Sequence, residues 1–166
     1  MRKVIFPGTF DPIHYGHLDI AKRASQMFDL VVIAVYDKPM KSLLFDPKTR
    51  MSLVEEAVAG IEGIEVVGYS GLTVAFAREI GAKAIVRGLR VFSDFEFEFR
   101  MALANRRLDD EIDTIALITD EENTFLSSST VKEIASLGGD VSSMVPPHVN
   151  RALLERFAEL GTNEQA

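Results

Sequence analysis

The chain has 166 residues, of which 47% are hydrophobic and 26% are charged, with a net charge of −7 and no cysteine. This length predicts one domain whose core needs no disulfide bond, and the missing cysteines exclude a thiolate metal site. The acidic balance argues against a nucleic-acid-binding protein, which usually carries a basic stripe. No apolar run reaches the roughly 18 residues of a membrane-spanning helix, and the run Val4–Phe6 ends at Pro7, too early for a signal peptide.

Short apolar runs alternate with amphipathic stretches along the chain. Strands are predicted, in chain order, at Val4–Phe6, Leu30–Val35, Ile64–Val67, Ala84–Val86 and Ile115–Ile118. Helices are predicted at Gly16–Phe28, from Pro47 to Ile61, and at Leu72–Ile80, 94–108, Thr130–Leu137 and Arg151–Leu160. We expect residues 1–160 to form the domain and residues 161–166 to be a frayed tail.

The segment 94–108 carries two conflicting patterns. Phe95, Phe97 and Phe99 alternate with glutamates, which is the periodicity of a strand. The run Met101–Leu108, however, is rich in strong helix formers, and Phe92, Phe95 and Phe99 also fall on one helical stripe. We therefore predict a helix, and the apolar Val91-Phe92 and Phe95–Phe99 region could form an interface.

Continuous apolar strands that alternate with helices predict an α/β fold. The expected architecture is a single-domain, Rossmann-like parallel sheet of about five strands with helices on both faces. Such sheets bind ligands outside the carboxyl ends of their strands, so residues that carry chemistry should follow each strand directly.

The segment after the first predicted strand contains candidate phosphate-binding groups. Gly8 allows a close backbone turn, Thr9 offers a hydroxyl, and His14 and His17 share one face at the start of a helix. Free N–H groups at a helix N-terminus favour phosphate, and His17 adds a donor. The same histidine spacing would suit zinc, but the only other histidine is the distant His148, so we favour phosphate.

Cations and hydroxyls follow the later strands as well. Lys41 lies in the loop after the second strand, where charge alone does not distinguish it from Lys38 and Lys48. Arg87-Gly88-Leu89-Arg90 ends the fourth strand, and arginine suits bidentate contacts with phosphate. Ser127–Ser129 open a helix after the fifth strand, which is more hydroxyls than capping requires. An acidic chain that collects these groups at one sheet edge predicts a site for a polyanion.

These motifs resemble a known family. Gly8-Thr9-Phe10-Asp11-Pro12 with Gly16-His17 is similar to the first motif of the nucleotidylyltransferase superfamily. Arg87-Gly88-Leu89-Arg90 with Asp94-Phe95-Glu96, and Ser127–Ser129 with Val131-Lys132-Glu133, narrow the resemblance to the bacterial phosphopantetheine adenylyltransferases, over residues 3 to 160. The resemblance implies transfer of the adenylyl group of ATP to 4′-phosphopantetheine, with dephospho-coenzyme A and pyrophosphate as products. It also implies Mg²⁺ on the ATP phosphates, coenzyme A as a further candidate ligand, a cytoplasmic location and a homohexamer.

The resemblance assigns roles by matching positions. It implies His17 and Lys41 as catalytic residues. It implies an acceptor site made by Thr9, Lys41, Thr73 and Arg87. It implies an ATP site made by Thr9, Phe10, His17, Gly88, Leu89, Arg90, Glu98, Asn123, Thr124, Phe125, Leu126, Ser127, Ser128 and Ser129.

The chemistry of phosphate attack limits what the protein must supply. The acceptor phosphate is already anionic, so we expect direct in-line attack without a covalent enzyme intermediate, helped by positioning and electrostatic stabilisation. Three alternatives stay open from the sequence: nucleotidyl transfer to nicotinamide mononucleotide or glycerol phosphate, a non-catalytic nucleotide-binding module, and an interaction protein.

Overall fold

The computed structural model describes residues 1–39 and 42–164. Its centre is a five-stranded parallel sheet, which confirms the predicted Rossmann-like α/β fold. Each predicted strand forms and is one to three residues longer than predicted: β1 (Lys3–Gly8), β2 (Leu30–Tyr36), β3 (Ile64–Tyr69), β4 (Ala84–Leu89) and β5 (Asp113–Ile118).

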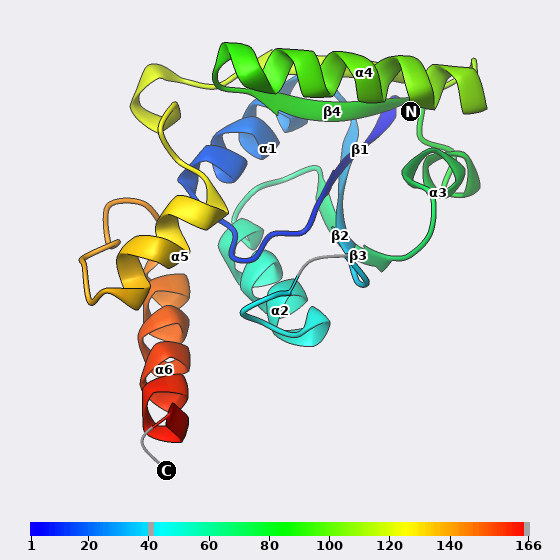
Figure 1. Ribbon diagram of the computed structural model, residues 1–166. Helices are drawn as coiled ribbons and strands as arrows, with labels where there is room; N and C mark the ends of the chain where they lie inside the picture. The colour runs from blue at the N-terminus through cyan, green and yellow to red at the C-terminus, as the bar shows by residue number, and fades with distance from the viewer. Residues whose placement is uncertain (40–41, 165–166) are drawn as a thin grey trace.

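Helices connect the strands and complete the C-terminal part of the chain. In chain order they are α1 (Tyr15–Met27), α2 (Pro47–Val58), α3 (Thr73–Glu79), α4 (Phe92–Leu108), α5 (Ser128–Ser136) and α6 (Pro147–Glu164), with a 3₁₀ turn η1 (Glu121–Asn123) before α5. Figure 1 shows α4 lying along one side of the sheet, with α5 and α6 at the opposite end of the molecule.

The strand order is β3-β2-β1-β4-β5. The sheet therefore divides between β1 and β4 into two halves, β3-β2-β1 and β4-β5. The chain reverses its winding direction between these two strands, and ligands bind at such a switch point, at the carboxyl ends of the strands. The register Val4 to Ala84 and Ile5 to Ile85 joins β1 to β4. The carboxyl ends of β1 and β4, at Gly8 and Leu89, therefore mark the expected ligand edge.

Both faces of the sheet are covered, as continuous apolar strands require. Val4 and Phe6 pack on one face with α1, α2, α5 and α6, in a core that includes Leu153. Ile5 points to the other face, where it packs with α3 residues such as Val74 and Ala77. This alternation along β1 is the two-residue period of a strand buried on both sides.

The helices differ from the sequence predictions by one to four residues at their ends, and the differences in α4 and α6 concern the conflicting segment and the expected tail. The conflicting segment is a helix, as predicted, but it starts at Phe92, and its phenylalanine stripe is exposed to solvent. The final helix starts at Pro147 instead of Arg151, because the fixed φ of proline suits the first helical turn. It also continues to Glu164, into the range that was expected to be a frayed tail.

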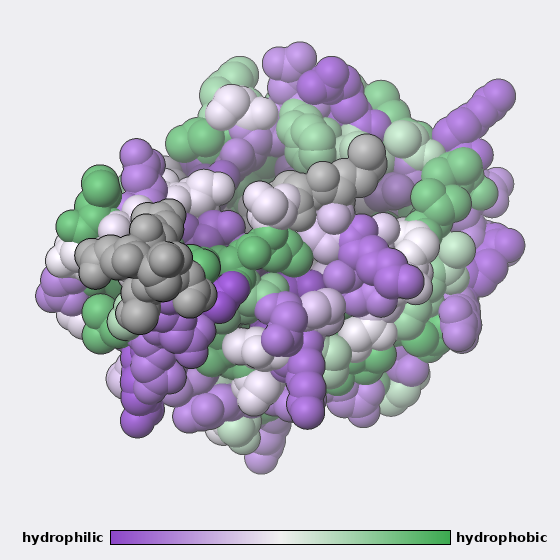
Figure 2. All heavy atoms as spheres, turned by 60° about the horizontal axis from the view of Figure 1, so that its bottom comes forward, coloured by the Kyte–Doolittle hydropathy of each residue, from purple (hydrophilic) through white to green (hydrophobic). Residues whose placement is uncertain are grey.

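Among the described residues, each helix lacks the length or the apolar character that is needed to cross a membrane. On the face shown in Figure 2, hydrophilic side chains cover most of the surface and hydrophobic residues gather in patches between them.

Candidate active site

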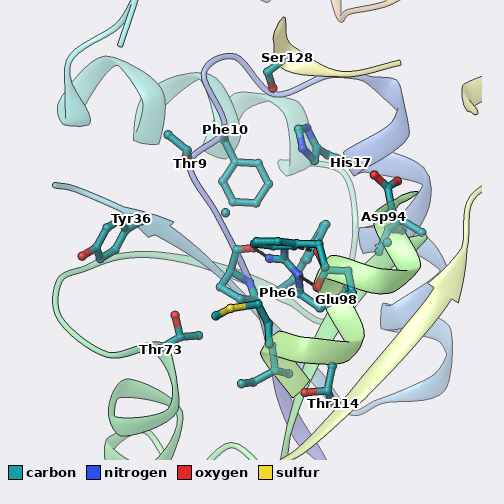
Figure 3. Close-up of a pocket in the computed structure, with 18 of the residues that line it drawn as sticks. Phe6, Thr9, Phe10, His17, Tyr36, Thr73, Asp94, Glu98, Thr114 and Ser128 are labelled. Carbon is teal, nitrogen blue, oxygen red and sulfur yellow. Dashed lines mark hydrogen bonds and ion pairs between the residues drawn. The ribbon is translucent and has the colours of Figure 1, made fainter. Parts of the chain in front are cut away.

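A cleft of about 680 Å³ opens at the carboxyl edge of the sheet. The ends of β1, β2, β3 and β4 form its floor, and α4, the start of α3 and the start of α5 contribute its walls. In Figure 3, His17, Phe10 and Ser128 lie at one end of the cleft, while Thr73 and Thr114 lie at the other. The strand-end rule therefore located the cleft correctly.

The turn after β1 brings Thr9 and Phe10 into the cleft. Phe10 has a φ of 51°, a left-handed backbone conformation that bulky residues rarely adopt. Its ring is almost fully buried and folds back over Gly8, where an added Cβ would lie 2.9 Å from Phe10 Cζ. Glycine at position 8 thus allows the turn to close tightly beside the cleft.

The two histidines at the start of α1 form a stacked pair. Their ring centroids lie 3.7 Å apart, and His17 also meets the Phe10 ring edge-on at 4.9 Å. The backbone N–H of His14 donates to His17 Nδ1 at 3.2 Å, and the Gly16 N–H donates to His14 Nδ1 at 3.1 Å. Since both Nδ1 atoms accept, each neutral ring carries its proton on Nε2.

Both histidines stay uncharged at neutral pH. Burial lowers the pKa of His14 to about 3, and Arg90 adds to the effect. Burial is also the main cause that lowers the pKa of His17 well below 6.5, followed by the charges of His14 and of the nearby arginines. His17 therefore enters the cleft as a neutral N–H donor rather than as an acid.

Arg87 on β4 and Arg90 just after it have matching partners: each donates to one carboxylate and to one backbone carbonyl. The Arg87 Nε and Nη2 donate to the two carboxylate oxygens of Glu98 at 2.8 and 2.7 Å, and its Nη1 donates to the Pro7 carbonyl at 2.8 Å. The Arg90 Nε and Nη2 donate to Asp94 at 3.0 and 3.1 Å, and its Nη1 donates to the Leu126 carbonyl at 2.5 Å. A guanidinium has five N–H donors, so these contacts, counted over the described residues, leave two on each arginine for a ligand.

The serines before and in the first turn of α5 all line the cleft, but they differ in what they bond. The Ser127 hydroxyl caps the helix by accepting the Thr130 N–H at 3.0 Å, and the Ser128 hydroxyl donates to the Pro12 carbonyl at 2.8 Å. No described residue hydrogen-bonds the Ser129 hydroxyl. The capping interpretation thus accounts for Ser127, and Ser129 keeps its hydroxyl available to a ligand.

The structure brings most of the predicted site residues together. Those that line the cleft are Thr9, Phe10, His17, Thr73, Arg87, Gly88, Arg90, Glu98, Ser127, Ser128 and Ser129. Thr73 opens α3, and its hydroxyl shares a 2.9 Å hydrogen bond with that of Tyr69.

Other predicted residues lie elsewhere. Of the described residues, those outside the cleft lining are Leu89, Asn123, Thr124, Phe125 and Leu126. Asn123 borders a smaller hollow next to α1, Phe125 is largely exposed, and Leu126 is buried. The last of these reaches the site through its carbonyl, which Arg90 binds. Lys41 falls outside the described residues, so its catalytic and acceptor-binding roles stay predictions.

Sequence reasoning missed most of one wall of the cleft, where Glu98 is the predicted site residue. The lining residues of α4 recur at helical spacing, namely Asp94, Phe97, Glu98, Met101, Ala102 and Asn105. Figure 3 shows Asp94 and Glu98 projecting from this helix. Their three- and four-residue spacing is visible in the sequence, but the phenylalanines of α4 form a stripe of the same spacing, which is the stronger apolar signal. Tyr36 and Tyr69 were missed although both end a strand.

Within residues 1–39 and 42–164, no three His, Asp or Glu side chains gather in a way that could hold a metal ion. The cleft carboxylates of Asp94 and Glu98 are each engaged by an arginine. A nucleotide that brings its own Mg²⁺ fits this arrangement, because Mg²⁺ takes most of its ligands from phosphate and water in such sites.

Comparison with known proteins identifies the family. The cytidylyltransferase-like family model matches residues 5–134. The phosphopantetheine adenylyltransferase of Methylococcus capsulatus is 54% identical over 157 residues, covering 95% of this chain and 97% of the relative. The enzymes of the same name from Desulfitobacterium hafniense and Chloroflexus aggregans are 49% and 48% identical, over 95% and 97% of this chain and 96% and 100% of their own lengths.

A solved structure supports the fold. A Vibrio parahaemolyticus protein described as a nicotinate-nucleotide adenylyltransferase superimposes with a TM-score of 0.71, covering 93% of this chain and 99% of its own. At 23% identity, this likeness speaks for the fold alone. The sequence relatives, which match nearly end to end, carry the assignment: the chain belongs to the phosphopantetheine adenylyltransferase family of nucleotidyltransferase enzymes.

Proposed function

We propose that this enzyme transfers the adenylyl group of ATP to 4′-phosphopantetheine, giving dephospho-coenzyme A and pyrophosphate. The observation that carries the proposal is one cleft that neutral His17, Arg87 and Arg90 all line, in a chain whose relatives bear that enzyme's name. Two arginines with N–H donors to spare suit two separate phosphate groups.

In the proposed reaction, an oxygen of the acceptor phosphate attacks the α-phosphorus of ATP in line with the bond to the β-phosphate. A new P–O bond forms to the α-phosphorus, and the α–β bridging bond breaks with its electron pair going to pyrophosphate. The attacking oxygen is already anionic, so no general base and no covalent enzyme intermediate is needed. The protein contributes by positioning the two anions and by stabilising the charge of the transition state.

His17 supports the α-phosphate in this mechanism. Its Nε2–H donates to a non-bridging α-phosphate oxygen as charge develops there, and its lowered pKa keeps it a hydrogen-bond donor that transfers no proton. His17→Ala should therefore lower kcat by about 10²–10³-fold with a small change in KM. Steady-state kinetics would test this role, and an unchanged kcat would contradict it.

The acceptor and the leaving group take opposite ends of the cleft. Thr9, Thr73 and Arg87, together with the predicted Lys41, bind 4′-phosphopantetheine, and Tyr36 and Tyr69 line the same cleft. Arg90 and Ser129 bind the β- and γ-phosphates, beside the N-terminus of α5, where free N–H groups favour anions. Magnesium enters with ATP and neutralises part of the triphosphate charge.

We also propose a homohexamer in the cytoplasm. The outward face of α4 supports association: among the described residues of this helix none is buried, and Phe92, Phe95, Phe99 and Leu103 are each at least half exposed. A stripe of this kind marks a surface that another protein surface covers. Light scattering would measure the mass, and a monomer at micromolar concentration would contradict the hexamer.

Pyrophosphate release from ATP and Mg²⁺ tests the function directly. Turnover with 4′-phosphopantetheine and none with nicotinamide mononucleotide is the expected result. Turnover with the mononucleotide alone would keep the mechanism and replace the acceptor. Tight ATP binding without turnover on either acceptor would contradict the enzyme assignment. Coenzyme A, which contains the phosphopantetheine group, should compete with the acceptor in the same assay.

A further inference from the structure

Arg50, in the first turns of α2, lies fully buried behind the cleft without lining it. Its guanidinium donates to backbone carbonyls from three separate segments. The Nη1 group reaches the carbonyls of Thr9 and Tyr36, both at 2.7 Å. The Nε and Nη2 groups reach the carbonyls of Phe45 and Asp37 at 3.3 and 3.4 Å.

These contacts join two of the strand ends that form the cleft floor. Thr9 follows β1 and Tyr36 ends β2, and both line the cleft. One terminal nitrogen of Arg50 therefore fixes the distance between them. An apolar side chain of similar size would avoid the cost of desolvating the Arg50 guanidinium. We therefore attribute the buried charge to its hydrogen bonds, which hold the backbone carbonyls in place.

Asp11 complements Arg50 from the other side of Phe10. Its carboxylate, 2% exposed, accepts the backbone N–H groups of Leu44 and Phe45, both at 2.9 Å. It also accepts a hydrogen bond of 2.8 Å from the ammonium group of Lys132 in α5. Phe45 is thus held at its N–H by Asp11 and at its carbonyl by Arg50.

Phe10 sits between these two anchored positions. Its carbonyl-side neighbour is Asp11, and its N-terminal neighbour Thr9 is the residue whose carbonyl Arg50 binds. A bulky residue keeps a φ of 51° only when its surroundings determine it. The Phe10 ring in turn meets His17 edge-on at 4.9 Å. A chain of contacts thus leads from Arg50 and Asp11 through Phe10 to His17.

We propose that Asp11 and Arg50 are positioning residues for the proposed reaction: together they hold the Phe10 turn in its left-handed conformation, so that the Phe10 ring fixes the orientation of the His17 imidazole. We call this pair the Asp11–Arg50 brace. The inference rests on the proposed function of His17 and adds to it two residues that touch neither substrate. Lysine could not replace Arg50, because its single ammonium carries three donors and lacks the planar fork that spans several carbonyls.

The test compares Arg50→Lys, Asp11→Asn and Val58→Ala. The first keeps the charge of Arg50, and the second keeps the size of Asp11 and one acceptor oxygen, so at least one of them should fold. Val58→Ala is the matched control, because Val58 is buried at the far end of the same helix and lies outside the cleft lining. All variants are ranked by thermal unfolding, and kinetics are measured at a temperature where each is folded.

A misplaced catalytic group should lower kcat and spare the ground-state affinity for ATP. We expect Arg50→Lys and Asp11→Asn to lose about 10–100-fold in kcat, with the KM for ATP close to that of the wild type and of Val58→Ala. A kcat loss no greater than that of the control, at equal loss of stability, would overturn the brace.

Nuclear magnetic resonance of the imidazole nitrogens separates this proposal from the proposed function, because it needs no turnover. His148, whose Nε2 lies 2.9 Å from the Leu53 carbonyl, serves as the internal reference. The His17 signals should move in Arg50→Lys and Asp11→Asn and stay in place in Val58→Ala, whichever acceptor the enzyme uses. Unmoved His17 signals would overturn the brace even if phosphopantetheine turns over.

Discussion

The pH dependence of stability offers a direct test of the stacked histidine pair, of which His14 is buried. His14 is 4% exposed, and burial lowers its pKa to about 3, whereas an unfolded chain has a histidine pKa near 6.5. As the pH falls below 6.5, the unfolded chain therefore gains a proton at this position that the folded chain does not bind. The stabilising contribution is complete above pH 6.5 and is lost as the pH falls toward 3.

The size of the effect follows from the pKa of His14 in the unfolded chain alone, since its pKa in the folded protein lies well below the pH range from 7 to 5. Each pH unit between 6.5 and 3 costs about 1.4 kcal/mol, so lowering the pH from 7 to 5 should remove about 2 kcal/mol of unfolding free energy through His14. His17 should add a loss in the same direction, because its pKa is also lowered. Paired carboxylates such as Asp94 have lowered pKa values and lose their contribution only below about pH 4, outside this range.

Urea unfolding of the wild type and of His14→Thr, at pH 7 and at pH 5, isolates the contribution of His14. Threonine keeps a capping oxygen at the N-terminus of α1 but has no group that titrates in this range. The variant should lose about 2 kcal/mol less than the wild type between the two pH values. Equal losses in the two proteins would refute the conclusion that His14 is buried in its neutral form.

Two other substitutions test the anion site and the backbone. Arg87→Ala should raise the KM for the acceptor by about 10–100-fold and the KM for ATP much less, because it removes charged hydrogen bonds and leaves Glu98 unpaired. Steady-state kinetics with each substrate varied in turn would measure both KM values. A larger rise in the KM for ATP would mean that the two anion sites are exchanged. Gly139→Ala should cost about 1–3 kcal/mol, because its Cβ would lie 2.5 Å from Ile134 Cγ2 and 3.0 Å from its carbonyl. Gly60→Ala is the matched control, since no described atom lies within 4 Å of its added Cβ, and denaturant unfolding that ranks the two alike would contradict the reasoning.

The sequence was informative where periodicity and strand ends decide the structure. Apolar runs located the five strands, and the strand-end rule placed Thr9, His17 and Arg87 at one edge of the sheet. These inferences work because a buried parallel sheet constrains both the composition of each strand and the position of the residue that follows it.

Long-range partners could not be read in this way. Arg87 and Glu98 are 11 residues apart, and Arg50 and Thr9 are 41 residues apart. Nothing in local spacing says which carboxylate an arginine will meet, because the answer depends on how α2 and α4 dock on the sheet. For the same reason the sequence predicted an edge of cations, whereas the structure balances Arg87 and Arg90 with two carboxylates.

That balance explains how an acidic protein can keep the proposed phosphate site ready. Two unpaired guanidinium groups beside His17 would repel each other and move freely in the cleft. Because Glu98 and Asp94 each hold one Arg through a bidentate contact, both guanidinium planes are fixed before a ligand arrives. The ligand then meets oriented N–H groups whose ordering has already occurred on folding, and this is the condition under which electrostatic stabilisation requires little reorganisation during the reaction.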